Sequence, residues 1–150
     1  KVMLLGGIDI GSNAMRLLIG EVYKEQDLIH INKISLIRLP VRLGSDVFES
    51  GKISPGKTKE FIKGMKAFSL IKDIYGVSDI RACATSAMRT AENGREITRL
   101  TKKETGINIE IIDGHTEADI ILSTFHMLSL KPDTPYLYID VGGGSTEEIG

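Results

Sequence analysis

The segment "IDIGSNAMRLLI" at residues 8–19 joins two apolar runs through a turn of small residues. The first run begins at Val2, and the second continues to Tyr23. A third stretch, 28–34, alternates apolar and polar residues, which is the period of a half-buried strand. Three such runs with tight links predict an antiparallel meander of three strands.

Beyond this meander, helical and strand patterns alternate. Ser54 and Pro55 predict a helix start, and apolar residues then recur every three or four positions until Gly76. There follow a strand at 78–85, a polar helix at 93–106, a strand at 107–112, an amphipathic helix at 115–130 and a glycine-containing hairpin at 136–150. The order β-β-β-α-β-α-β-α predicts an α/β fold. We expect a ribonuclease-H-like (actin-like) lobe, a mixed five-stranded sheet with helices on both faces.

Composition and charge exclude several classes of protein. The net charge is −1, so there is no overall basic field, and we expect neither nucleic acid nor a membrane as partner. No segment is long and apolar enough to cross a bilayer, and no signal peptide is visible, so we expect a cytoplasmic protein. The single cysteine, Cys83, excludes an internal disulfide and a cysteine-rich zinc site. It lies in an apolar run, where we expect a small core side chain.

The stretch "GKISPGKT" at 51–58 matches the P-loop pattern G-x-x-x-x-G-K-[ST]. A P-loop follows a buried strand and leads into a helix at its lysine. Here the preceding "LGSDVFES" is polar, and Ser54 and Pro55 already begin a helix inside the pattern. Pro55 also has no N–H to donate to a phosphate. We therefore interpret the stretch as a helix N-terminus after a loop, with Lys57 in solvent.

Two other turns, "IDIGSN" (8–13) and "IDVGGGST" (139–146), resemble each other. Each follows a strand ending in an aspartate, and each contains glycine and small polar residues. Glycine reaches positive φ and lets a phosphate approach the main chain, so such a turn can direct several N–H groups at one anion. The aspartates fit such a site if Mg²⁺ or its water shell lies between carboxylate and phosphate. Two ordinary hairpins are the alternative.

Four segments carry a resemblance to a known family: "IDIGSNAMRLLI", "ATSAMRTAENG" (84–94), "IEIIDGHTEADII" (109–121) and "YIDVGGGSTE" (138–147). Together they resemble the exopolyphosphatase/guanosine pentaphosphate phosphohydrolase (Ppx/GppA) family of the actin–sugar kinase–Hsp70 superfamily. The resemblance covers essentially the whole chain and implies two lobes with the active site between them. Residues 1–131 would form the first lobe, and residues 132–150 the connector and first strand pair of a truncated second lobe.

The resemblance also implies roles for individual residues. Glu117 matches the catalytic glutamate, the general base that activates water, although a glutamate in a first helical turn is also common because of the helix dipole. The metal-binding positions are Asp140, Glu147 and Asp9, any of which could instead be a solvated strand-end acid. The phosphate-binding positions are Gly11, Ser12, Asn13, Arg89, Gly142, Gly143, Gly144 and Ser145.

Arg89 comes shortly after the fourth strand, where such folds bind ligands. A guanidinium can hold a phosphate through two parallel hydrogen bonds, and a surface salt bridge is the alternative. The chain departs from the family pattern at His115, Thr116 and Asp119. An Asp119 that faced the cleft would make its entrance more acidic and would disfavour tight binding of long polyphosphate. His115 could relay a proton or be an ordinary helix-end residue.

The implied reaction is hydrolysis of a terminal phosphoanhydride, assisted by Mg²⁺ or another divalent cation, with Glu117 as the base. The substrate would be inorganic polyphosphate or guanosine pentaphosphate. The alternatives are a superfamily kinase for a sugar or acetate, and a non-catalytic sensor of polyphosphate or an alarmone. We expect a homodimer for the full-length protein and little activity for the 150-residue chain alone. We also expect the hairpin at 136–150 to be disordered, to fold back on the first lobe or to pair with a second chain.

Overall fold

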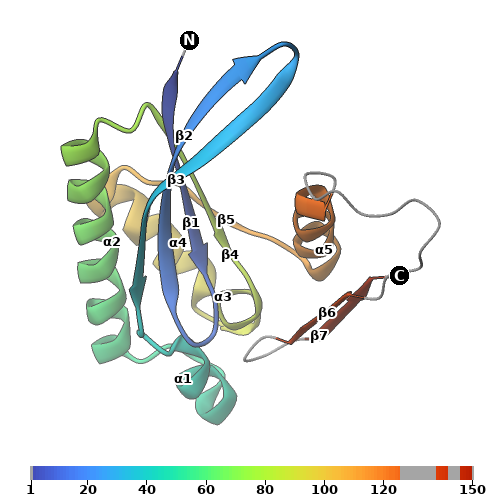
Figure 1. Ribbon diagram of the computed structural model, residues 1–150. Helices are drawn as coiled ribbons and strands as arrows, with labels where there is room; N and C mark the ends of the chain where they lie inside the picture. The colour runs from blue at the N-terminus through green and yellow to red at the C-terminus, as the bar shows by residue number, and fades with distance from the viewer. Residues whose placement is uncertain (1, 126–137, 142–145, 150) are drawn as a thin grey trace.

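The main sheet has five strands, as predicted (Figure 1). The computed structural model describes residues 2–125, 138–141 and 146–149, and the side chains of residues 2–120. The strands are β1 (Met3–Ile10), β2 (Met15–Glu25), β3 (Leu28–Leu39), β4 (Asp79–Ala84) and β5 (Ile109–Ile111), in the spatial order β3-β2-β1-β4-β5. The first three strands are antiparallel, and β1, β4 and β5 run parallel to one another.

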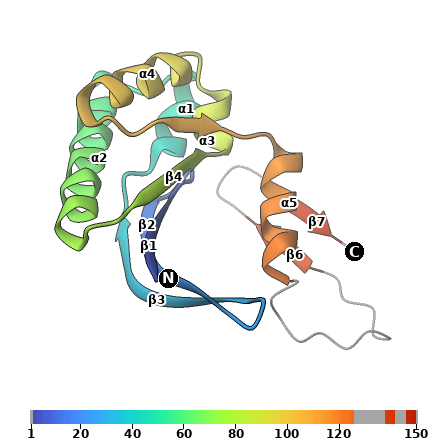
Figure 2. The same ribbon diagram turned by 90° about the horizontal axis from the view of Figure 1, so that it is seen from above.

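Helices lie on both faces of this sheet, which confirms the predicted fold class. α2 (Pro55–Tyr75) and α4 (Gly94–Thr105) cover one face, and α5 (Gly114–Phe125) lies on the other side (Figure 2). The short helices α1 (Leu43–Ser50) and α3 (Ser86–Thr90) lie at the end of the sheet where β1 and β4 end (Figure 1).

The covered face of the sheet holds the core. Alternate residues of β1 and β2 are buried there and pack with one face of α2. Removing each such side chain from water contributes about 1.5–3 kcal/mol. The largest fully buried members of this layer are Ile10, Met15, Leu17, Ile19, Phe61, Met65 and Phe68.

The predicted signals for α2 are present at both ends, whereas α1 has such a signal only at its end, where Gly51 is the C-cap with φ of 76°. In α2, Ser54 Oγ accepts a hydrogen bond from the Lys57 N–H at 3.2 Å, and Gly76, with φ of 68°, ends the helix. α1 follows Arg42, which has a left-handed backbone with φ of 56° and makes no side-chain cap. Leu43 and Val47 are buried and α1 contacts α3, so tertiary packing rather than an N-terminal signal determines where this helix begins.

A second, two-stranded sheet is formed by β6 (Tyr138–Val141) and β7 (Thr146–Ile149). The two strands pair with each other, and β7 contacts α5. The expected lobe boundary, between 131 and 132, lies outside the described residues. Within the part of the chain that the structure describes, no helix is long and apolar enough to cross a membrane.

Candidate active site

A cavity of about 500 Å³ lies on the face of the sheet opposite α2 and α4. It brings together Asp9 at the end of β1 and Glu117 in the first turn of α5, two of the predicted site residues. The other lining residues come from β1, β2, β3, β4, α5 and the segments that follow β4 and β5. They are Gly7, Ile8, Arg16, Leu18, Leu36, Arg81, Cys83, Thr85, Ile112 and Ile120.

Glu117 is held in place by the start of α5. Asp113 precedes the helix, and its carboxylate accepts a hydrogen bond from the Thr116 N–H at 2.7 Å. The Glu117 N–H donates to the Asp113 carbonyl at 3.0 Å. The hydrogen bonds from Thr116 lower the pKa of Asp113, and the nearby His115 and Arg89 add to this effect. The Glu117 side chain is only 17% exposed and lies where the helix dipole favours a carboxylate.

Arg89 contacts Glu117 from α3. Its Nη1 donates to the Ile112 carbonyl at 2.6 Å and lies 3.7 Å from Glu117 Oε2. The guanidinium therefore joins α3 to the loop before α5 and places a positive charge beside the candidate base. Arg89 does not line the cavity itself, and its predicted contact with phosphate stays a prediction.

Asp9 is engaged by an arginine that the sequence did not single out. Arg16, directly opposite on β2, places its Nη1 3.2 Å from Asp9 Oδ2. A second arginine, Arg81, makes two hydrogen bonds to the Glu110 carboxylate, at 3.2 and 3.1 Å. The alternation of side chains along β2 and β4 could have indicated that Arg16 and Arg81 share a face with Asp9.

The turn at Gly11, Ser12 and Asn13 adjoins this cavity without lining it. The carbonyls of Ser12 and Asn13 accept hydrogen bonds from the N–H groups of Gly44 at 2.8 Å and Arg42 at 3.0 Å, so the turn is fastened to the start of α1. Ser12 is only 5% exposed, and its Oγ has no hydrogen-bond partner among the described residues. A buried hydroxyl without a partner is unusual and suits a ligand oxygen.

Gly11 departs from the expectation in two ways. The glycines with a left-handed backbone in the described part of the chain are Gly51, Gly76 and Gly106, so the turn does not use positive φ at Gly11. Its N–H donates to the Ala14 carbonyl at 3.0 Å and closes the turn. Gly11 thus shapes the turn, and its amide is occupied within the protein.

Cys83 is not the core residue that its apolar surroundings suggested. β4 turns it towards the cavity, where it is half-buried, because Ala82 and Ala84 take the positions facing the core. Burial raises the pKa of the Cys83 thiol, which keeps it protonated at neutral pH. Asp119 is exposed and does not line this cavity, and its effect on the entrance to the cleft between the lobes stays a prediction. His115 is likewise exposed, at the start of α5.

The second predicted turn is described only in part. Asp140 and Glu147 are directly opposite each other in the β6–β7 pair, so the backbone places the two acids at one register position. The residues between them, Gly142, Gly143, Gly144 and Ser145, lie outside the described residues. Among the side chains described for residues 2–120, no group of three or more His, Cys, Asp and Glu could hold a metal ion.

The "GKISPGKT" stretch is a helix N-terminus, as interpreted from the sequence. The Ser54 N–H donates to Asp46 Oδ2 at 2.9 Å, so a carboxylate of the protein already accepts from one of the backbone N–H groups of this stretch. This hydrogen bonding with Ser54 lowers the pKa of Asp46. Lys57 is only partly exposed and pairs with Glu60 at 3.6 Å, so its expected solvation is incomplete.

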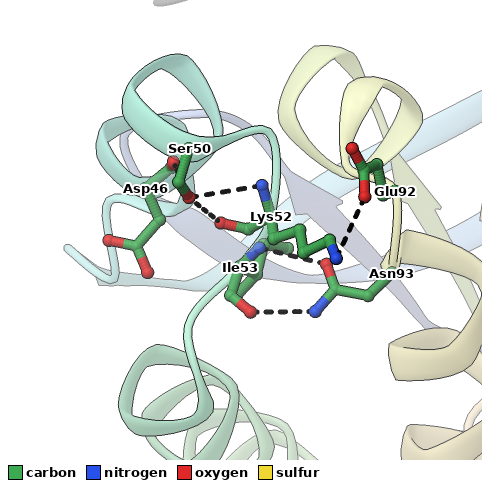
Figure 3. A network of polar contacts seen from close by, with 6 residues as sticks. All are labelled: Asp46, Ser50, Lys52, Ile53, Glu92 and Asn93. Carbon is green, nitrogen blue, oxygen red and sulfur yellow. Dashed lines mark hydrogen bonds and ion pairs between the residues drawn. The ribbon is translucent and has the colours of Figure 1, made fainter.

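A polar network fixes the loop before α2 to the loop before α4 (Figure 3). The Asn93 amide accepts from the Ile53 N–H at 3.0 Å and donates to the Ile53 carbonyl at 2.8 Å. Lys52 Nζ pairs with Glu92 Oε2 at 3.2 Å, and the Glu92 N–H donates to the Gly51 carbonyl at 3.0 Å. The loop that follows α3, the helix carrying Arg89, is therefore tied to the end of α1.

The fold and this geometry define a ribonuclease-H-like lobe with a carboxylate-containing cavity at the carboxyl ends of its central strands. The chain belongs to the Ppx/GppA phosphatase family, whose model matches residues 22–149.

Several relatives are similar over nearly the whole chain. A solved exopolyphosphatase from Cytophaga hutchinsonii is 31% identical with a TM-score of 0.87, over 98% of this chain and 46% of that one. A Ppx/GppA family member from Aquifex aeolicus is 30% identical with a TM-score of 0.85, over 99% of this chain and 47% of that one. Exopolyphosphatase 1 of Mycobacterium tuberculosis is 30% identical over 97% of this chain and 41% of its own length. The chain thus spans less than half the length of these relatives.

Proposed function

We propose that the intact protein hydrolyses the terminal phosphoanhydride bond of inorganic polyphosphate, with Glu117 as the general base. The observation that carries this proposal is the environment of Glu117: a largely buried carboxylate in a cavity shared with Asp9 and beside the guanidinium of Arg89. Membership of a phosphatase family and the similarity to proteins named exopolyphosphatases support the reaction class.

In the proposed reaction, a water molecule lies between Glu117 and the terminal phosphorus. The carboxylate accepts a proton from this water as its oxygen forms a bond to phosphorus, and the bridging P–O bond breaks. Inorganic phosphate and a polyphosphate shortened by one unit leave, and the proton passes from Glu117 to solvent. Arg89 favours the ionised form of Glu117, the form that can accept a proton.

The phosphate groups are proposed to bind at the two glycine turns. Ser12 supplies its buried hydroxyl, and Ser12 and Asn13 supply main-chain N–H groups. Residues 142–145 would supply the same kinds of donor from the second turn. Such preorganised donors stabilise the negative charge of the transferred phosphoryl group.

Asp140 and Glu147 fit a divalent cation, because the backbone pairing brings two acidic residues, whose carboxylates are oxygen ligands, to one register position. When bound, Mg²⁺ would neutralise charge on the phosphate oxygens. Asp9 is a less direct candidate, since its carboxylate already pairs with Arg16.

Guanosine pentaphosphate is the second candidate substrate, because it ends in the same kind of phosphoanhydride and the matched family carries both activities in its name.

We also propose that the 150-residue chain alone has little activity, because it spans less than half of the length of its relatives. A homodimer of the intact protein stays a prediction.

The reaction class is tested by hydrolysis in ¹⁸O-labelled water with Mg²⁺ present. Water attack on the terminal phosphorus puts the label into the released phosphate. ATP consumption that depends on a sugar or acetate, with no label in phosphate, would instead identify a kinase. Tight binding of polyphosphate with no release of phosphate under any condition would identify a sensor.

A further inference from the structure

Helices α2 and α4 are much more basic than the rest of the chain. Together they carry nine lysines and arginines against four acidic residues, a net charge of +5, whereas the whole chain has −1. The remaining residues are therefore net acidic. We call the outer side of these two helices the basic helix layer. It covers the face of the sheet opposite the candidate active site (Figure 2).

Most of these cations have no carboxylate partner. Lys57, Lys66 and Lys72 form ion pairs with Glu60, Glu104 and Asp73. The other six are exposed and form no ion pair with any residue that the structure describes. They are Lys59, Lys63, Arg95, Arg99, Lys102 and Lys103.

A groove of about 700 Å³ runs between α2 and α4. Lys59 and Lys63, one helical turn apart, line its α2 side. Lys66 spans its far end by pairing with Glu104 at 2.8 Å. The lining also includes Glu96, so the free lysines lie on one side of the groove and this carboxylate on the other.

The groove begins at the end of the sheet where the phosphate turn lies. Ile53 and Asn93, which are hydrogen-bonded to each other, line the groove at this end (Figure 3). Helix α1 connects this end of the groove to the turn, because Gly44 at its start donates to the Ser12 carbonyl and the carbonyl of its C-cap Gly51 accepts from the Glu92 N–H. An extended polyanion whose end is bound at the turn can therefore reach the groove by passing over α1.

The lining of the groove favours a chain of phosphates over a protein or nucleic acid. The apolar floor of the groove consists of Ile53, Ile62 and Ile97, each at most 8% exposed. Such buried side chains give a protein partner little apolar surface to bind. The other apolar lining residues, Leu100 and Pro55, lie at the edges of the groove. No aromatic residue is among the described residues that line the groove, so it offers no side chain on which bases could stack. Flexible, unpaired lysines suit a polyanion, whose binding gains from counterion release.

We propose that the basic helix layer, with Lys59 and Lys63 at its centre, is a second, non-catalytic binding surface for the body of a long polyphosphate chain. The proposal rests on the proposed function, since it concerns the same substrate. It predicts a dependence on chain length: a long chain reaches both sites, whereas tripolyphosphate reaches only the catalytic one. Long chains are then held more tightly and released less often between cleavages.

The test compares the intact protein with the Lys59→Gln/Lys63→Gln double variant on long-chain polyphosphate and on tripolyphosphate. The matched control is Lys24→Gln/Lys33→Gln, which removes the same charge from the β2–β3 hairpin. We expect the KM for the long chain to rise about tenfold in the first variant, from two lost ion contacts. Its kcat, its KM for tripolyphosphate and both constants of the control variant should stay unchanged.

An unchanged KM for the long chain, or an equal rise for both substrates, would overturn the proposal. Direct binding of long-chain polyphosphate to the native protein and to the double variant separates this outcome from a failure of the proposed function. If neither substrate is hydrolysed, the proposed function fails, and a loss of binding in the double variant alone still supports the surface. Equal competition by single-stranded DNA of the same total charge would show a general polyanion surface and contradict a polyphosphate site.

Discussion

Arg89 Nη1 lies 3.7 Å from Glu117 Oε2 and donates to the Ile112 carbonyl just before α5 at 2.6 Å. One guanidinium therefore sets both the position of the loop that leads to the candidate base and the charge beside it. Its remaining N–H groups are the ones that a phosphate would use.

Replacing Arg89 should impair turnover more than folding. In the intact protein we expect Arg89→Ala to lower kcat about a hundredfold, the usual size of a lost preorganised donor. Arg89→Lys keeps the positive charge but cannot form the bidentate hydrogen bonds of a guanidinium, and it should retain more activity than Arg89→Ala. Phosphate release at saturating polyphosphate measures both. Arg38→Ala, an exposed arginine of β3, is the control. Equal activity of the native protein and Arg89→Ala would remove Arg89 from the site.

Substitution of Ser12 should weaken substrate binding without lowering the stability of the protein. Its buried Oγ has no partner in the described part of the chain, so Ser12→Ala loses no internal hydrogen bond. We expect its free energy of unfolding to change by less than about 0.5 kcal/mol, whereas the KM for polyphosphate rises severalfold because a phosphate donor is lost. Ser78→Ala, which removes a hydroxyl bonded to the Leu4 carbonyl at 2.8 Å, is the comparison and should not affect KM. An unchanged KM in Ser12→Ala would argue against a phosphate at this turn.

Asn93 should matter for stability because its amide satisfies both backbone groups of Ile53. Asn93→Ala leaves these partly buried groups unpaired, which should lower the free energy of unfolding by about 2 kcal/mol. Denaturant unfolding measures this loss. Asn32→Ala removes only an exposed contact to Glu21 at 3.4 Å and should cost little. Equal effects of the two substitutions would show that the Asn93 contact does not hold the two loops together.

The Asp113 cap of α5 should make the stability of the folded protein depend on pH. The folded pKa of Asp113 is lowered, first by the hydrogen bond from the Thr116 N–H, so its ionised form favours the folded state. This contribution is complete above the ordinary value of 3.8 and is lost as the pH falls through the lowered pKa. Asparagine also caps helices but does not ionise there.

In Asp113→Asn, the decrease in Tm between pH 6 and pH 2 should therefore be smaller than in the native protein. Asp27→Asn, in the exposed β2–β3 turn, should leave that decrease almost unchanged. A decrease that is identical in the native protein and Asp113→Asn would show that the Asp113 carboxylate does not contribute.

Local patterns predicted the elements that carry their own signals. The apolar runs of β1 and β2, the alternation in β3, and the Ser54 cap, Pro55 and Gly76 of α2 are such signals, and the five-stranded sheet followed from them. Helix α1 was missed because it has no N-terminal cap and begins through buried contacts, and α3 because five residues are too few to show a period.

The candidate site was predicted less completely than the fold. Glu117 and Asp9 do share a cavity, but Arg16, Arg81 and Cys83 were not expected there. Their positions depend on which face of the sheet is left uncovered by α2 and α4. That choice is made by tertiary packing, and an apolar run such as the one around Cys83 does not reveal it.

The role of Glu117 as the general base is tested by phosphate release from polyphosphate by the intact protein and by Glu117→Gln, with Mg²⁺ present and Glu110→Gln as the control. Glutamine keeps the size of the side chain but cannot accept the proton, so we predict that kcat falls by about 10²–10⁴ while KM stays similar. Glu110→Gln, which breaks only the exposed pair with Arg81, should remain active. Native-like turnover by Glu117→Gln would show that Glu117 is not the general base but an ordinary acid at the start of a helix.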